Sequence, residues 1–288
     1  MPHPFRPRRS VLYMPGANAR ALEKARAIPC DALIFDLEDA VAPDAKAAAR
    51  ANVVAAIEQG GYGHRELIVR VNGLDTAWGA DDVAAVARLG IDAVLFPKVE
   101  TLAQIDAWLA CLDAAGGGAL PVWFMVETPL AVLDVRRLAA HTARLAALVM
   151  GTSDLVKALR ARHTEERHNL AFALQHCVLA ARALGLDVLD GVHLEFRNLE
   201  SFRAACRQAR DMGFDGKTLI HPSQVDDANA IFGYDDAAVA HARRVLEVWQ
   251  EATAQGRGVA VLDGQLIENL HAAEAERVLA FAEALAGR

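Results

Sequence analysis

The sequence predicts an α/β fold, a (β/α)8 TIM barrel followed by a helical C-terminal lid extension. Eight short apolar runs recur along the chain, stretches of helical composition separate them, and polar residues follow directly after most runs. Such runs are typical of strands buried on both faces, and strands that alternate with helices favour a parallel sheet. Eight units over about 220 residues suit a barrel of ordinary size. The runs cover residues 11–14, 32–35, 67–71, 93–96, 122–126, 148–150, 188–192 and 218–220.

An open, doubly wound sheet is the alternative, and the polar residues after the runs favour the barrel. Barrel active sites are built from the C-terminal ends of the strands and the loops after them, so these residues would meet at one mouth. The polar positions are 15–18, 36–39, 70–72, 97–98, Glu127, Asp154, Asp190 and 221–222.

The pattern of the chain changes after the eighth run. Residues 223–232 and 235–254 are helical in composition, 255–258 form a flexible break, 259–265 resemble a small hairpin, and 266–285 form a last helix. The sequence therefore predicts a barrel over residues 1–232. It also predicts a helical lid segment over residues 233–288 that folds over a barrel mouth, its own or that of a neighbouring subunit.

Composition excludes several classes of protein. The chain has 288 residues, is 53% hydrophobic and carries a net charge of −7, which argues against general nucleic-acid binding. Its four cysteines are widely separated and form no C-x-x-C pair, so neither a disulfide framework nor a zinc ribbon is indicated. We expect no signal peptide and no membrane span, and therefore a cytoplasmic protein.

Two neighbouring runs each end in a carboxylate. The run 122–126 closes on Glu127, where Thr128 suits a helix N-cap and Pro129 the first helical position, and the next run leads to Asp154. Carboxylates at neighbouring strand tips repel and raise each other's pKa unless a cation lies between them. With two protein oxygens on offer, water and substrate complete the shell, which suits Mg²⁺. The alternative is that both acids cap helices or pair with arginines.

An arginine lies near the end of an otherwise apolar run. An unpaired guanidinium in that place is costly, so Arg70 must face acids or an anionic substrate, and a fixed salt bridge to Asp36 or Glu38 is the alternative to substrate binding. Asp36, Glu38 and Asp39 place three acids at one strand end, more than a helix cap requires. We interpret them as acceptors for metal-bound waters.

Two basic residues follow the first run at helical spacing. Arg20 and Lys24 are four residues apart and share one helix face. A solvated basic face and a phosphate clamp are both consistent with this spacing.

Seven ordered motifs resemble the CitE-like branch of the HpcH/HpaI aldolase family, which includes the citrate lyase β-subunit, malyl-CoA lyases and thioesterases, and citramalyl-CoA lyases. The resemblance runs from about residue 9 to the C-terminal helix. It implies a Mg²⁺-dependent TIM barrel, commonly a trimer, whose C-terminal segment reaches the site of an adjacent subunit. The motifs are Arg9-Ser10-Val11-Leu12-Tyr13-Met14-Pro15-Gly16, Asp36-Leu37-Glu38-Asp39-Ala40-Val41, Val69-Arg70-Val71-Asn72, Pro97-Lys98-Val99, Glu127-Thr128-Pro129, Gly213-Phe214-Asp215-Gly216-Lys217 with Ile220-His221-Pro222, and Leu262-Asp263-Gly264.

The resemblance also implies roles for individual residues. Glu127 and Asp154 would be the direct metal ligands, and Arg70 would bind the oxygen that becomes charged when the carbon–carbon bond breaks. Asp263 would act as acid/base at the acyl α-carbon. The CoA thioester would be held by Tyr13, Arg20 and Lys24, with backbone N–H groups of the turn that includes Gly151, Thr152 and Ser153 stabilising developing negative charge.

Three functions are consistent with these roles. The first is a Mg²⁺-dependent lyase that cleaves a 3-hydroxyacyl-CoA, such as malyl-CoA or citramalyl-CoA, to an acyl-CoA and a 2-oxo acid. The second is a thioesterase that hydrolyses such a thioester. The third is a citrate lyase β-type subunit that needs an acyl-carrier partner. We expect the ligands to be a CoA thioester and a small 2-oxo acid, and the protein to be a homo-oligomer, a trimer or a multiple of one.

Overall fold

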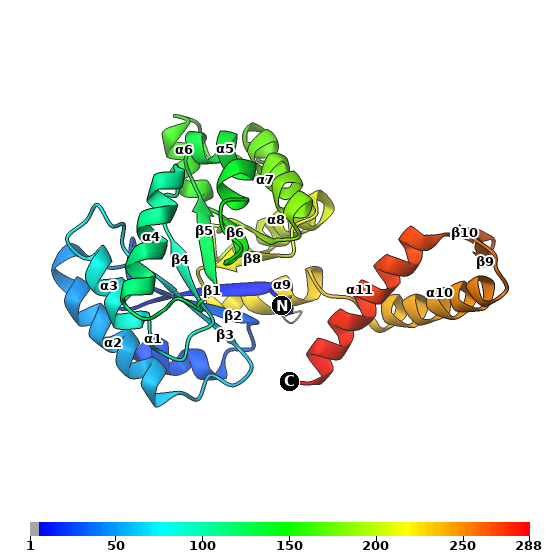
Figure 1. Cartoon of the computed structure of the whole chain (residues 1–288), viewed down its shortest axis with the longest axis horizontal. Helices are drawn as coiled ribbons and strands as arrows, with labels where there is room; N and C mark the ends of the chain where they lie inside the picture. The colour runs from blue at the N-terminus through cyan, green and yellow to red at the C-terminus, as the bar shows by residue number, and fades with distance from the viewer. Residues whose placement is uncertain (1–5) are drawn as a thin grey trace. The chain divides into compact units, whose positions relative to one another are not determined.

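The structure is a computed structural model that describes residues 6–288, and its strands form a closed parallel barrel. Each strand pairs with the next, and β1 closes the barrel by pairing Ser10 with Lys217 of β8. Helices α2 to α8 lie outside these strands (Figure 1). The predicted TIM barrel is therefore confirmed. The strands are β1 (Ser10–Pro15), β2 (Ala32–Asp36), β3 (Glu66–Arg70), β4 (Ala93–Phe96), β5 (Val122–Val126), β6 (Leu145–Met150), β7 (Asp187–Asp190) and β8 (Gly216–Leu219).

The helices follow the strands in the alternation that the sequence predicts. Thr128 caps α5 through its hydroxyl, which accepts from the N–H of Ala131, and Pro129 occupies the first helical position as expected. The helices of this part of the chain are α1 (Ala19–Lys24), α2 (Lys46–Gln59), α3 (Gly79–Val86), α4 (Leu102–Ala114), α5 (Pro129–Ala139), α6 (Thr152–Ala158), α7 (Ala171–Leu184), α8 (Leu199–Met212) and α9 (Val225–Ile231).

The barrel interior is filled by alternate side chains of its strands. Trp123, which is fully buried, packs among small and branched residues such as Ala32, Ile68 and Val149. Because large and small side chains interdigitate in this way, the middle of the barrel is a packed core and not a pore.

A buried ion-pair group lies at the start of the barrel chain. Arg8 donates to both carboxylate oxygens of Glu66 at 2.7 Å and to Asp187 at 2.5 Å. Its guanidinium carbon also lies 5.0 Å from the centre of the Trp123 ring. One cation thus links the segment before β1 to the first residues of β3 and β7. These residues lie at the N-terminal ends of the strands, whereas the predicted site lies at the C-terminal ends.

The chain divides into two compact units, Arg8–Asn229 and a second unit that contains Ala230–Arg288. The second unit contains α10 (Asp236–Ala254), β9 (Ala260–Leu262), β10 (Gln265–Ile267) and α11 (Asn269–Ala286). Its apolar core includes Val245, Ile267 and Val278. Its function as a lid stays a prediction. Within the described part of the chain, no helix combines the length and apolarity needed to cross a bilayer.

Candidate functional site

A cavity of about 310 Å³ lies at the C-terminal ends of the barrel strands. Nine of the thirteen predicted site residues line it, and they come from β1, β2, β3 and the segments after β5 and β6. These nine are Tyr13, Asp36, Asp39, Arg70, Glu127, Gly151, Thr152, Ser153 and Asp154. The apolar part of the lining includes Met125, Met150, Val192 and Ile220.

Glu127 is buried at the base of this cavity, with 1% of its surface exposed. Its Oε1 accepts a hydrogen bond of 2.8 Å from the backbone N–H of Lys98. Burial, and then the negative charge of Glu38, raise the pKa of Glu127 to about 7, although Lys98 and Arg70 act in the opposite direction. A buried carboxyl group with a raised pKa lacks a sufficient counter-charge, which a bound cation would supply.

Asp154 lies in the first turn of α6 and faces the same cavity as Glu127. Neither carboxylate forms an ion pair with an arginine among residues 6–288, so the alternative of arginine partners finds no support. The described residues hold no group of three His, Cys, Asp or Glu side chains suited to a metal. Two carboxylates that leave most of an oxygen shell to water and substrate fit Mg²⁺.

Gly151 permits the close approach of the turn after β6 to Glu127. A Cβ atom at Gly151 would meet Cβ of Glu127 at 2.3 Å, Oε2 of Glu127 at 2.5 Å and Cε of Met125 at 3.0 Å. The backbone φ of Gly151 is −94°, which any residue can adopt. The requirement for glycine is therefore steric, and it concerns the Glu127 side chain from its Cβ to the oxygen that Lys98 does not bind.

Arg70 is held by acids and also lines the cavity. It donates to both oxygens of Asp36 at 2.7 Å, and its Nη1 lies 3.0 Å from Oε2 of Glu38. Burial alone would raise the pKa of Asp36, but the charge and hydrogen bonds of Arg70 hold it below its usual value. The fixed salt bridge considered from the sequence is thus present, and it presents the guanidinium to the cavity.

Tyr13 lies beside this guanidinium. The ring centre is 4.9 Å from the guanidinium carbon of Arg70, and the hydroxyl donates to the sulfur of Met125 at 3.5 Å. Burial raises the pKa of the Tyr13 phenol well above its usual value. The side chain is therefore a neutral wall of the cavity.

Two lysines near the site were given no role from the sequence, although Lys98 was among the polar residues expected at the mouth. Lys46 is buried, and its ammonium donates to the carbonyl oxygens of Leu37 and Glu38 and to Oδ1 of Asn72. This arrangement fixes the loop after β2. Lys98 has a left-handed backbone with φ of 48°, which directs its N–H to Glu127, and its ammonium pairs with Glu38.

The other four predicted residues do not line this cavity, and one of them, Glu38, pairs with Arg70 and Lys98. Arg20 and Lys24 are exposed on α1 and do not line the cavity. Asp263 belongs to the second unit, in the turn between β9 and β10, and its side chain is 60% exposed. The 2.7 Å hydrogen bond from Arg244, with its charge, lowers the pKa of Asp263 below its usual value.

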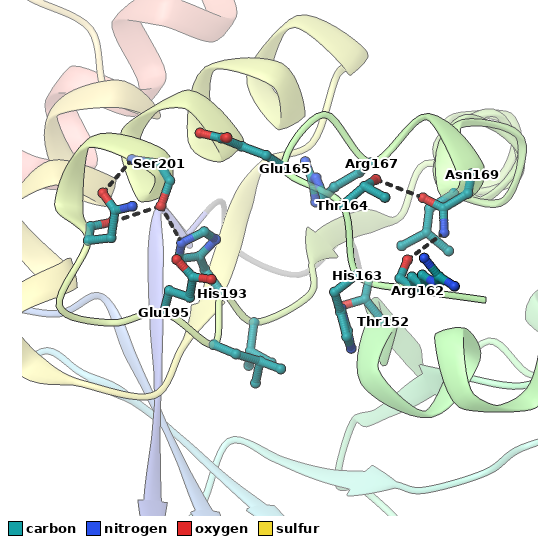
Figure 2. Close-up of a pocket in the computed structure, with 14 residues that line it drawn as sticks. Thr152, Arg162, His163, Thr164, Glu165, Arg167, Asn169, His193, Glu195 and Ser201 are labelled. Carbon is teal, nitrogen blue, oxygen red and sulfur yellow. Dashed lines mark hydrogen bonds between the residues drawn. The ribbon is translucent and has the colours of Figure 1, made fainter. Parts of the chain in front are cut away.

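A second cavity, of about 250 Å³, adjoins the first (Figure 2). Thr152 and Val192 line both cavities, so the two spaces share a wall. The loop before α7 borders the second cavity. It is anchored by Arg167, which donates from Nη1 to both oxygens of Asp190 at 2.8 Å. Asp190, the last residue of β7, also accepts from buried Lys217 at 2.5 Å. We expected it at the barrel mouth with the other polar residues, but it does not line the first cavity.

A family model, curated relatives and solved structures each match most of this chain. Residues 9–222 match the family described as HpcH/HpaI aldolase/citrate lyase. A (3S)-malyl-CoA thioesterase of Cereibacter sphaeroides is 49% identical over 286 residues, 99% of this chain and 98% of that protein. An L-malyl-CoA/beta-methylmalyl-CoA lyase of the same species is 34% identical, over 98% and 96% of the two chains. CitE of Mycobacterium tuberculosis, solved with magnesium, acetoacetate and coenzyme A, is 29% identical with a TM-score of 0.76, over 95% and 97% of the chains.

Proposed function

Because the chain belongs to the HpcH/HpaI aldolase/citrate lyase family, we propose that it is a Mg²⁺-dependent carbon–carbon lyase that acts on a 3-hydroxyacyl-CoA of the malyl-CoA type. The products would be an acyl-CoA and a 2-oxo acid. The observation that carries this proposal is the pair Glu127 and Asp154, which line one cavity with Arg70 and have no arginine partner of their own among residues 6–288. The solved relative with magnesium and coenzyme A supports it.

Glu127 and Asp154 would hold the Mg²⁺. The raised pKa of Glu127 supports this role, because its buried carboxylate needs a counter-charge. When bound, the ion would act as a Lewis acid toward the substrate carboxylate and hydroxyl. Lys98 would keep one oxygen of Glu127 fixed through its N–H, and Gly151 would leave the other oxygen free.

Arg70 and the turn after β6 would stabilise the charge that develops on cleavage. The guanidinium is already oriented by Asp36 and Glu38, so it would bind a substrate oxygen without reorganising. The N–H groups of residues 152–154 at the start of α6 would add donors, whereas the N–H of Gly151 already donates to the carbonyl oxygen of Val126 at 3.0 Å. Breaking the carbon–carbon bond leaves its electron pair on the acyl α-carbon as a thioester enolate, which needs a proton.

Asp263 would supply that proton from the lid of an adjacent subunit in a trimer. Its carboxylate is exposed and paired with Arg244, so the acid form requires that this pair be broken or weakened. Arg20 and Lys24, both exposed on α1, would bind phosphate groups of CoA.

A thioesterase is the second candidate, and a specific observation favours it. The relative that is 49% identical over nearly the whole chain carries that name. A hydrolase would use the same binding residues and add a water molecule to the thioester carbonyl.

Product analysis tests the proposal. The purified chain is incubated with Mg²⁺ and a panel of malyl-CoA and citramalyl-CoA esters, and the products are identified by mass. A lyase releases a 2-oxo acid and acyl-CoA, whereas a thioesterase releases free CoA and the intact hydroxy acid. Turnover by the isolated chain would also exclude a requirement for an acyl carrier.

Asp154→Ala should abolish Mg²⁺-dependent turnover while the barrel stays folded, and Asp211→Ala, an exposed acid on α8, serves as the matched control. Undiminished wild-type activity in EDTA refutes the metal role.

A further inference from the structure

The second cavity contains a histidine whose hydrogen bonds fix its tautomer. His193 Nε2 lies 2.9 Å from the hydroxyl oxygen of Ser201, as the dashed line in Figure 2 marks. The same hydroxyl donates to the carbonyl oxygen of Asn198 at 3.1 Å. A serine hydroxyl has a single proton, and with that proton donated to Asn198, Ser201 accepts from His193 and Nε2 carries the hydrogen.

It follows that Nδ1 of His193 is an acceptor. No residue of the described chain, 6–288, makes a hydrogen bond to Nδ1, and the ring lines the cavity. The ring is held in place on several sides. The ring makes a T-shaped contact with Phe202, with 5.9 Å between ring centres. The backbone carbonyl of His193 accepts a hydrogen bond from the side chain of Gln224. Burial, and then the charges of Lys217 and Arg167, lower the pKa of His193, which favours the neutral ring.

The hydrogen bonds of Ser201 give it a structural role in the start of α8. A nucleophilic serine gives its proton to a histidine nitrogen, whereas Ser201 gives its proton to a backbone carbonyl. Ser201 is also 5% exposed and lies in the first turn of α8, where it is tied to the capping residue Asn198. Its place in the cavity is to position His193.

We propose that His193 is the base that activates water for hydrolysis of the CoA thioester, with the second cavity holding that water. This inference rests on the proposed binding of a CoA thioester in the first cavity. Val192, the residue before His193, lines both cavities together with Thr152, so the two cavities adjoin at these side chains, and water held at His193 would meet the substrate there. The protein would then cleave the carbon–carbon bond at Glu127 and Asp154, and it would hydrolyse the thioester with the water that His193 activates.

The hydrolytic step balances without a further reactant. The water oxygen forms a bond to the thioester carbonyl carbon, and its proton moves to Nδ1 of His193. Collapse of the tetrahedral adduct breaks the carbon–sulfur bond, and its electron pair leaves on sulfur. The proton passes from Nδ1 to the departing thiolate, which gives free CoA and the hydroxy acid.

Two products measured in one incubation test the inference. Free thiol reports hydrolysis, and 2-oxo acid reports carbon–carbon cleavage. His193→Phe keeps a ring beside Phe202 but removes the acceptor, and it should reduce free thiol release about a hundredfold, the usual scale of general base catalysis. Release of the 2-oxo acid should change less than about twofold, because the metal ligands are untouched.

His193→Gln is the second variant, since glutamine can still bond to Ser201 but cannot act as a base. The matched control is His176→Phe on α7. The ring of His176 stacks on Phe172, and this variant should change neither product. Unchanged thiol release in a folded His193 variant overturns the inference, as does an equal loss of both products. A wild-type protein that forms 2-oxo acid but no free thiol overturns it as well. If the wild type forms no 2-oxo acid, the proposed lyase fails, while thiol release still tests His193.

Discussion

Gly151→Ala should weaken Mg²⁺ binding while leaving the fold intact. The added Cβ would lie 2.3 Å from Cβ and 2.5 Å from Oε2 of Glu127, whereas ordinary van der Waals contact begins at 3.4 Å, so the turn and the Glu127 side chain must move apart by about 1 Å. Ligand distances in protein metal sites are held within about 0.2 Å. Changes that disturb a ligand in this way typically cost about ten- to a hundredfold in metal affinity, or roughly 1.4–2.7 kcal/mol.

Isothermal titration with Mg²⁺, or electron paramagnetic resonance with Mn²⁺, measures the affinity directly. Gly90→Ala is the matched control, because a Cβ there meets no atom within 4 Å. Thermal unfolding without metal shows whether each variant is folded. If Gly151→Ala binds the ion as tightly as Gly90→Ala does, then Glu127 is not a ligand or does not lie where the structure places it.

Three further predictions follow from charges and backbone strain. Because the pKa of Glu127 is raised from 4.5 to about 7, its contribution to metal-free stability is present below pH 4.5 and is lost as pH rises through about 7. Glu127→Gln should therefore be more stable than wild type at pH 8 in EDTA by up to about 3 kcal/mol, with little difference at pH 4.5, and equal pH profiles in chemical unfolding would contradict this. Lys98→Gly should be more stable than Lys98→Ala by about 1 kcal/mol, because only glycine adopts the φ of 48° without cost; coincident denaturation curves of the two variants would remove the strain argument. Arg244→Met should raise the pKa of Asp263 toward its usual value, as followed by carbon NMR, and an unmoved titration midpoint would show that the ion pair does not form in solution.

The strands could be predicted from the sequence because a parallel barrel buries both faces of each strand. Every apolar run became a strand, and most boundaries shifted by one to three residues. Strand β6 begins at Leu145, three residues before the predicted run, because it pairs with Val122 of β5. A boundary that depends on the partner strand cannot be predicted from the local pattern of residues.

The carboxylates and Arg70 could be predicted as site residues from the sequence because each interrupts or closes an apolar run. Lys46 was not predicted, and Lys98 was expected at the mouth without a role, since a lysine in a loop or a first helical turn is usually solvated. The acceptors of the Lys46 ammonium come from the loops after two different strands, which only the closed barrel brings together. The tautomer of His193 likewise depends on a helix that begins six residues later.

The ion-pair group around Arg8 has a consequence for shortened forms of this protein. Removing the chain through Arg8 would leave the carboxylate of Glu66, which is 5% exposed, without the guanidinium that pairs with it. Losing one partner of a buried pair typically costs about 3–5 kcal/mol, a large share of the stability of a single domain. Proteolytic removal of Arg8 should therefore shorten the lifetime of the folded protein, so an arginine at the end of the barrel opposite the candidate site limits how far the N-terminus can be trimmed.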